Sequence, residues 1–168
     1  DPLMGERRAL AEFKEERGRT SVALRFEPYR SFFVVFREAP EDAYKSPAAQ
    51  EDAFPATAEI VSLSGPWDVS FDPAWGGPEK VVFERLDDWR FRPDAGIKYY
   101  SGQAVYRKTF DLPRVQAAGN GRLWLDLGQV EVMASVRLNG RDLGVVWCDP
   151  RRVDITAAVK AKGNRLEI

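Results

Sequence analysis

Carboxylates are the residues of this sequence that could perform acid–base chemistry, because it contains no histidine. Histidine is the commonest general base near neutral pH and the commonest metal ligand. Glycoside hydrolysis by the usual route needs two carboxyl groups about 5 to 9.5 Å apart that face one cleft. The 26 Asp and Glu residues lie mostly beside Lys or Arg or in turns, as is typical of a solvated surface. We therefore expect no catalytic residues, and this chain alone is not expected to be an enzyme.

Other catalytic and metal-binding patterns are also absent. Cys148 is the single cysteine and has no histidine partner, so we expect a small buried apolar residue rather than a nucleophile or a zinc ligand. The sequence contains no GxxxxGK[ST], GxSxG or HExxH, and no cofactor is expected. One alternative stays open, in which a structural calcium ion is held by Asp149, Asp154, Asn139 and Asp142 together with backbone carbonyls, although no loop of fixed spacing supports it.

Aromatic side chains are the more informative candidates. Trp67 and Trp124 lie in strand-like alternation, which is typical of a core. Trp147 instead enters a polar segment, and a flat apolar face beside hydrogen-bonding groups suits a saccharide. The alternative is that Trp147 anchors the packing of domains. The candidate carbohydrate-binding residues are Trp147, Asp149, Arg151, Arg152, Tyr99 and Tyr100.

Charge and hydropathy exclude two classes of partner. Lys and Arg number 25 against 26 acids, and no basic block is present, so nucleic acid is not an expected partner. No apolar run reaches the roughly 18 to 20 residues that span a bilayer, so no membrane association is expected. The first residues, DPLMGERRAL, also lack the apolar stretch of a signal peptide.

The first third of the chain predicts a hairpin followed by a linker. Apolar residues alternate on both sides of Pro28 from Thr20 to Arg37, which predicts a β-hairpin. The stretch before it, Arg7 to Arg17, fits either a short helix or a strand ending at Phe13. A lone hairpin is marginal in water, so we expect residues 1–37 to be the tail of a preceding β domain. Residues 38–58 contain three prolines and no apolar period, which predicts a linker.

Residues 59–168 predict an all-β, antiparallel jelly-roll sandwich. Short β-rich runs follow one another with turn residues between them: EIVSLSG, PWDVSF, VVFERL, AVYRKTFDLP, RLWLDLG, VEVMASVRLNG, DLGVVWC, RRVDIT and NRLEI. Asn139-Gly140 suits a tight primed turn, and Thr156 suits the cap of a single helical turn closed by Gly163. The last run looks like a truncated strand, so we expect the chain to be a piece of a longer protein.

Several of these segments together resemble a known module. They are GPWDVSF, LDDWRF, YYSGQAVYRKTFDLP, RLWLDLGQVEVMASVRLNGRDLGVVW and RRVDITAAVKAKGNRLEI. They are similar to the sugar-binding, galactose-binding-domain-like jelly roll of family 2 glycoside hydrolases. The resemblance is closest to the version at the C-terminal end of bacterial α-L-rhamnosidase-like enzymes of glycoside hydrolase family 106. It covers about Ser64 to Ile168, and the preceding hairpin resembles the final strands of an upstream β domain in that family.

The resemblance implies an accessory role. In such enzymes the acid and the base belong to a separate catalytic barrel, which nothing in this sequence resembles, so no catalytic residue carries over. The implied partners are carbohydrate and the neighbouring domains of a periplasmic or secreted parent enzyme, with α-L-rhamnosides as the substrate class. Two alternatives remain: a purely structural domain that braces its neighbours, and an autonomous carbohydrate-binding module. An exposed aromatic platform would favour binding.

Overall fold

The structure is a computed structural model that describes residues 2, 5, 7, 10, 13–26, 30–36, 57–112 and 121–168. The chain divides into two compact units, Asp1–Ala58 and Glu59–Ile168. The predicted linker, residues 38–58, lies outside the described residues apart from Thr57 and Ala58. In the described ranges, no helix has both the length and the apolar character needed to cross a membrane.

The N-terminal unit contains a hairpin, but at a different place from the predicted one. β1 (Phe13–Glu16) pairs antiparallel with β2 (Arg19–Val22), so neither the short helix nor the strand ending at Phe13 describes this segment. Arg17 and Gly18 make the turn with φ of 51° and 72°. Residues 23–26 and 30–36 form no strand, so the hairpin predicted around Pro28 was wrong. A tight turn favours residues that tolerate positive φ, which glycine does and proline cannot do.

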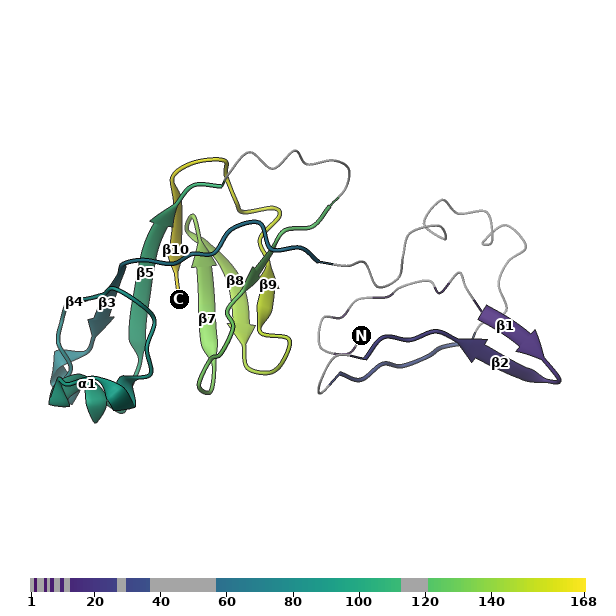
Figure 1. The fold of residues 1–168 in the computed structure, drawn as a ribbon, viewed down its shortest axis with the longest axis horizontal. Helices are drawn as coiled ribbons and strands as arrows, with labels where there is room; N and C mark the ends of the chain where they lie inside the picture. The colour runs from purple at the N-terminus through teal and green to yellow at the C-terminus, as the bar shows by residue number, and fades with distance from the viewer. Residues whose placement is uncertain are drawn as a thin grey trace. The chain divides into compact units, whose positions relative to one another are not determined.

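The second unit is an antiparallel sandwich, as predicted (Figure 1). Its main sheet has six strands in the order β4-β3-β5-β10-β7-β8, and a second sheet pairs β6 with β9. The strands of the main sheet are β3 (Trp67–Phe71), β4 (Val81–Phe83), β5 (Ala104–Phe110), β7 (Ala134–Leu138), β8 (Arg141–Val146) and β10 (Asn164–Glu167). Those of the second are β6 (Trp124–Asp126) and β9 (Arg152–Asp154). The strand predicted over residues 59–65 does not form.

The core lies where one face of the six-stranded sheet meets the small sheet. Alternate residues of β3 point inward, so Trp67, Val69 and Phe71 are buried while Asp68 is exposed. The small sheet contributes Val153 to the same cluster. The full set of buried apolar residues is Trp67, Val69, Phe71, Phe83, Ile97, Tyr100, Val136, Leu138, Val146, Val153, Ile155 and Leu166. Trp67 is thus a core residue as predicted, and Trp124 is half-buried.

One end of the main sheet, where β7 turns into β8 and β10 begins, is closed by a network of amide hydrogen bonds. We call it the turn end. Asn139 and Gly140 adopt φ of 54° and 83°, which confirms the predicted primed turn. The Nδ2 of Asn139 donates to the fully buried Asn164 Oδ1 at 2.9 Å. Asn164 in turn accepts from the Lys160 N–H at 2.7 Å and donates to the Lys160 and Phe110 carbonyls.

The predicted helical turn after β9 is a hydrogen-bonded turn with a different cap. The N–H groups of Ala158 and Val159 both donate to the Ile155 carbonyl. The capping acceptor is the Asp154 carboxylate, which binds the Thr156 N–H at 2.9 Å. The Thr156 hydroxyl instead accepts from the Leu123 N–H at 2.8 Å and so ties the turn to β6. The prediction placed the cap two residues too late, because an aspartate can accept from the N–H two residues on.

Candidate functional site

The other end of the main sheet gathers the loops and helical turns that contain the predicted site residues. The strand register places the end of β3, the starts of β5 and β7 and the end of β8 together at this end, which we call the loop end. Three short helical turns lie there, η3 (Pro73–Trp75), η4 (Trp89–Phe91) and α1 (Ala95–Lys98). Two loops lie at the same end: residues 127–133 before β7 and residues 147–151 after β8 (Figure 1).

Trp147 is exposed because it continues the alternation of β8. Val146 points into the core, whereas Val145 before it and Trp147 after it point outward. The Trp147 side chain is 63% exposed. Cys148, which was predicted to be buried, is half-buried and free. The loop therefore begins with a flat aromatic side chain presented to solvent.

Arg151 connects the two loops of this end. Its Nη1 donates to the Val130 carbonyl in the loop before β7. Its Nε lies 3.3 Å from the Asp149 Oδ1, within ion-pair distance but without the geometry of a hydrogen bond. The Asp149 side chain remains 41% exposed. Part of the Arg151 guanidinium is thus committed to holding the loops together, and Asp149 keeps an accessible carboxylate.

Backbone strain accompanies this pair of loops. Val132, the next-to-last residue of the 127–133 loop, has a φ of 75°. Its side chain is exposed, as is that of Met133. A β-branched residue in the left-handed region is an outlier that costs about 1 to 3 kcal/mol. Such strain is concentrated at functional sites, because elsewhere it carries no benefit.

Arg152, Tyr99 and Tyr100, the other predicted site residues, lie outside the loop that contains Trp147, Asp149 and Arg151. The guanidinium carbon of Arg152 lies 5.3 Å from the centre of the Trp124 ring, a cation–π contact between β9 and β6. Tyr99 is highly exposed at the end of α1. Tyr100 is buried, and its hydroxyl accepts from the Asp72 N–H at 3.1 Å and donates to the Gln103 carbonyl at 3.0 Å. The ring of Tyr100 is therefore covered by the fold.

The predicted site residues form two groups at the same end of the sheet. Trp147 follows β8, whereas Tyr99 and Tyr100 precede β5, and β10 and β7 lie between those two strands. Three strand spacings correspond to about 14 Å. The structure thus pairs Asp149 with Arg151 in the loop that begins with Trp147 and places Tyr99 in a separate group.

Several known proteins are similar to this chain. No family model matches the sequence. A protein of Formosa agariphila named "Putative beta-glucuronidase" is 43% identical over 108 residues, which are 64% of this chain and 9% of that protein. A solved rhamnosidase from Novosphingobium sp. PP1Y matches with a TM-score of 0.72 and 35% identity over 92% of this chain and 14% of its own. The β-glucuronidase of Ruminococcus gnavus matches with a TM-score of 0.53 and 25% identity over 68% of this chain and 22% of its own.

The chain is related to domains of glycoside hydrolases. It spans less than a quarter of the length of each of these three proteins. The resemblance to glycoside hydrolases inferred from the sequence is therefore supported, together with the sandwich fold. These proteins include both a rhamnosidase and a β-glucuronidase, so the similarity points to glycoside hydrolases without choosing between these two activities.

The aspartates of this glycoside hydrolase-related domain shape turns. Seven of them accept a backbone N–H, six from the residue two positions on and Asp111 from the distant Gly163: Asp72, Asp88, Asp94, Asp111, Asp126, Asp142 and Asp154. The Arg90 side chain, followed by its backbone N–H, lowers the pKa of the exposed Asp88 below its ordinary value. The general acid of a glycoside hydrolase needs the opposite shift. Asp88 is thus unsuited to that role.

The four residues considered for calcium cannot share one ion. Asn139 and Asp142 lie at the start of β8 and Asp149 lies beyond its end. The six residues of β8 span about 20 Å. Among the residues that the structure describes, no group of three or more His, Cys, Asp or Glu side chains could hold a metal ion.

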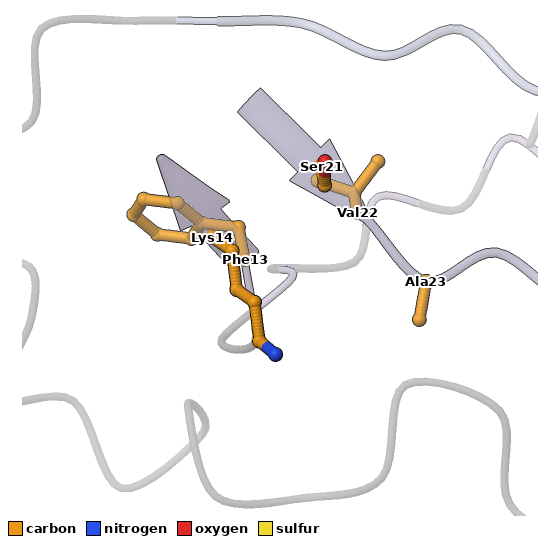
Figure 2. A pocket seen from close by; sticks show the side chains of 5 residues that line it. All are labelled: Phe13, Lys14, Ser21, Val22 and Ala23. Carbon is orange, nitrogen blue, oxygen red and sulfur yellow. The ribbon is translucent and has the colours of Figure 1, made fainter. Parts of the chain in front are cut away.

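A hollow in the N-terminal unit is unrelated to these groups. Figure 2 shows that it is formed by the two strands of the hairpin, with Phe13 and Lys14 on β1 opposite Val22 and Ser21 on β2. Of its described lining residues, which also include Ala23, Lys14 alone carries a charge. It contains no predicted site residue.

Sequence reasoning missed two exposed aromatic residues at the loop end, Trp75 and Phe91. Each lies three residues after an aspartate that caps its helical turn, Asp72 and Asp88 respectively. The aspartates in DPAW and DDWRF signal the caps of these turns, but they do not show whether the third residue of the turn is exposed. The segment at Trp75 was interpreted as a turn, without a prediction for its side chain.

Proposed function

We propose that this chain is a non-catalytic accessory domain of a glycoside hydrolase that contacts carbohydrate through the loop from Val145 to Arg152. The observation that carries the proposal is the exposed indole of Trp147 in the same short loop as the accessible carboxylate of Asp149. Tryptophan is enriched at interfaces, because its large apolar ring also carries a polar N–H group. The strain at Val132, in the loop that Arg151 holds, supports the same location.

The chemistry of the contact follows from these side chains. The indole face of Trp147 offers apolar contact to the C–H surface of a sugar ring. Asp149 offers acceptors to sugar hydroxyls, and the N–H groups of Arg151 that do not bind Val130 offer donors. One exposed ring and two polar residues in the same loop support weak binding, with a Kd of about 1 mM, or about 4 kcal/mol.

The non-catalytic part of the proposal rests on the acids and on the missing histidine. The sequence offers no histidine as a general base. Seven aspartates are engaged with backbone N–H groups, as described above. We therefore expect the isolated chain to release no sugar from aryl rhamnosides or galactosides.

A rhamnosidase-like parent is the favoured form of the proposal. The unit Glu59–Ile168 makes up about two thirds of the chain. The match to the β-glucuronidase of R. gnavus, over 68% of the chain, has about that length. The match to the rhamnosidase, over 92%, must also include much of the N-terminal unit. Similarity over both units supports a rhamnosidase-like arrangement, with α-L-rhamnosides as the substrate class and residues 1–37 as the tail of a preceding domain.

Sugar titrations with a matched pair of variants test the proposal. Rhamnose, galactose and pectic fragments are titrated against the parent chain, Trp147→Ala and Trp75→Ala, with a thermal melt of each protein. Trp75 is the control, because it is also an exposed tryptophan at the loop end. We expect binding by the parent and by Trp75→Ala, and none by Trp147→Ala. Both variants should unfold within about 1 kcal/mol of the parent, as expected of surface changes.

The same data identify the structural alternative. If the parent binds none of these sugars, the carbohydrate-binding part of the proposal is overturned. If Trp147→Ala is destabilised by about 3 to 5 kcal/mol, Trp147 is a packing anchor instead of a binding residue. Equal loss of binding in both variants would place the sugar elsewhere at the loop end.

A further inference from the structure

One irregularity in β8, the edge strand of the six-stranded sheet, sets the direction of its later side chains (Figure 1). Arg137 of β7 pairs with Asp142 of β8, and Ser135 pairs with Val145. Between these two pairs β7 advances by two residues and β8 by three, so β8 holds one extra residue. The strand therefore contains a β-bulge, in which two residues of one strand lie opposite a single residue of the other.

Gly144 supplies the backbone conformation of the bulge. Its φ is 93°, a region that glycine adopts readily and that other residues, β-branched ones above all, adopt only at a cost. The Asp142 carboxylate accepts the Gly144 N–H at 2.8 Å and so holds the extra residue in place. A Cβ added at Gly144 would meet no atom within 4 Å beyond its chain neighbours. The requirement for glycine therefore comes from the backbone angle and not from crowding.

The bulge reverses the alternation of the side chains that follow it. Leu143 packs against the core, so in a regular strand Val145 and Trp147 would also point to that side. The extra residue shifts the alternation by one, and a shift of one residue moves every later side chain to the other face. Val146 is accordingly 7% exposed, whereas Val145 and Trp147 are 54% and 63% exposed.

The packing of the core does not by itself select the bulge. In the bulged strand Val146 lies opposite Ala134. A regular strand would place Val145 at that position instead, and the two side chains are identical. A regular strand would also turn the Trp147 indole toward the core side, which the burial of apolar surface favours. The bulge therefore exposes a large aromatic side chain without improving the core.

We propose that Gly144 is a positioning residue for the carbohydrate contact, because its bulge turns Trp147 from the core side of β8 to the side that faces solvent. This role rests on the proposed function. β-Bulges are over-represented next to active sites, where they re-aim a side chain. Gly144 has no side chain to offer a sugar, so it acts only through Trp147.

Three changes at this one position test the role. Gly144→Val disfavours positive φ but keeps the extra residue, so we expect β8 to become regular and Trp147 to turn inward. Deletion of Gly144 removes the extra residue, so Ser135 can still pair with Val145 without a bulge and Trp147 should keep its direction. Gly144→Asn is the conservative variant, because asparagine tolerates positive φ better than most residues, and it should behave like the parent.

Hydroxyl-radical oxidation with mass spectrometry measures the exposure of Trp147 without any sugar. Trp75 and Trp67, which are 70% and 4% exposed, give the rates of an open and a buried tryptophan in the same chain. In Gly144→Val we expect the Trp147 rate to fall from near the Trp75 value toward the Trp67 value. In the deletion variant and in Gly144→Asn it should stay near the Trp75 value.

Sugar titrations show whether this direction of Trp147 matters for binding. Rhamnose and pectic fragments are titrated against the parent and the three variants. Gly144→Val should lose at least about tenfold in affinity, from a Kd of about 1 mM to one above about 10 mM. The deletion variant and Gly144→Asn should bind as the parent does. A merely structural role of Gly144 predicts a different order, with the deletion at least as harmful as the substitution by valine.

The results that overturn this role are distinguishable from a failure of the proposed function. An unchanged Trp147 oxidation rate in Gly144→Val would refute the role, and so would a lower rate in the deletion variant. If Gly144→Val does not fold, the deletion variant decides: Trp147 exposed as in the parent supports the role, and its protection refutes it. If the parent binds none of these sugars, the proposed function fails, while the oxidation rates still decide whether the bulge directs Trp147.

Discussion

The two ends of the six-stranded sheet show opposite ways of using polar and aromatic side chains. At the turn end, the amides of Asn139 and Asn164 bind one another and the surrounding backbone, and Asn164 is fully buried. At the loop end, the side chains of Trp147, Trp75 and Phe91 are exposed to solvent. A saturated polar network specifies one conformation, whereas exposed rings contribute nothing to the stability of the isolated domain. The turn end therefore holds the fold, and the loop end carries the aromatic side chains that the fold leaves exposed.

The strongest test of this contrast is the loss of the buried amide. Asn164→Ala leaves the Lys160 N–H and carbonyl, the Phe110 carbonyl and one Asn139 N–H without that partner. We expect a loss of about 3 to 5 kcal/mol in the free energy of unfolding, since each buried unsatisfied group costs about 1 to 3 kcal/mol. Chemical denaturation measures it.

The control for that change is the next residue. Arg165→Ala removes an exposed side chain from the same strand and should shift stability by no more than about 0.5 kcal/mol. Equal effects of the two substitutions would show that the turn end has no special role in holding the fold.

A smaller effect of opposite sign is expected at the loop end. Val132→Gly relieves a β-branched residue at φ 75° whose side chain is exposed, so it should raise the free energy of unfolding by about 1 kcal/mol. Val132→Ala is the control and should gain less, because alanine keeps a Cβ in the left-handed region. A loss of stability in Val132→Gly would mean that the loop is not strained.

The smallest effect appears only at alkaline pH. Burial raises the pKa of Tyr106 above its ordinary value, against the opposing effect of the hydrogen bond from Trp89. A pKa that is higher in the folded state stabilises the protein below the unfolded pKa of about 10, and this contribution is lost as the pH rises through the folded value. Denaturation of the parent and of Tyr106→Phe between about pH 9 and 11 should show a steeper decline for the parent. Parallel curves would contradict this.

The sequence predicted most of the sandwich because its strands carry local signals. Trp67, Val69 and Phe71 alternate with polar residues, and Asn139-Gly140 can hardly form anything other than a primed turn. The hairpin around Pro28 failed because alternation alone does not make a turn, and Arg17-Gly18 supplies the positive φ that Pro28 cannot. The strand expected at residues 59–65 had alternation but found no pairing partner among the described strands.

The candidate site was predicted less completely, since side-chain direction depends on contacts that the sequence does not show. Trp147 is exposed and Asp149 keeps an accessible carboxylate, whereas the Tyr100 ring packs on Phe71 and Trp89 and is buried. Arg152 stacks on Trp124 across the small sheet, a pairing set by the β6–β9 register. The exposure of Phe91 likewise follows from the packing of η4, which no local pattern reveals.

The most direct test of the central claim, that the Trp147 loop contacts carbohydrate, is the NMR spectrum of the indole N–H groups. The chain has five tryptophans, each with one such group, and single substitutions assign them. On titration with rhamnose or pectic fragments, we predict that the Trp147 signal shifts progressively. The signals of the buried Trp67 and of Trp89, which is bonded to Tyr106, should stay in place. A Trp147 signal that stays fixed at saturating sugar, or shifts confined to Trp75, would contradict the account.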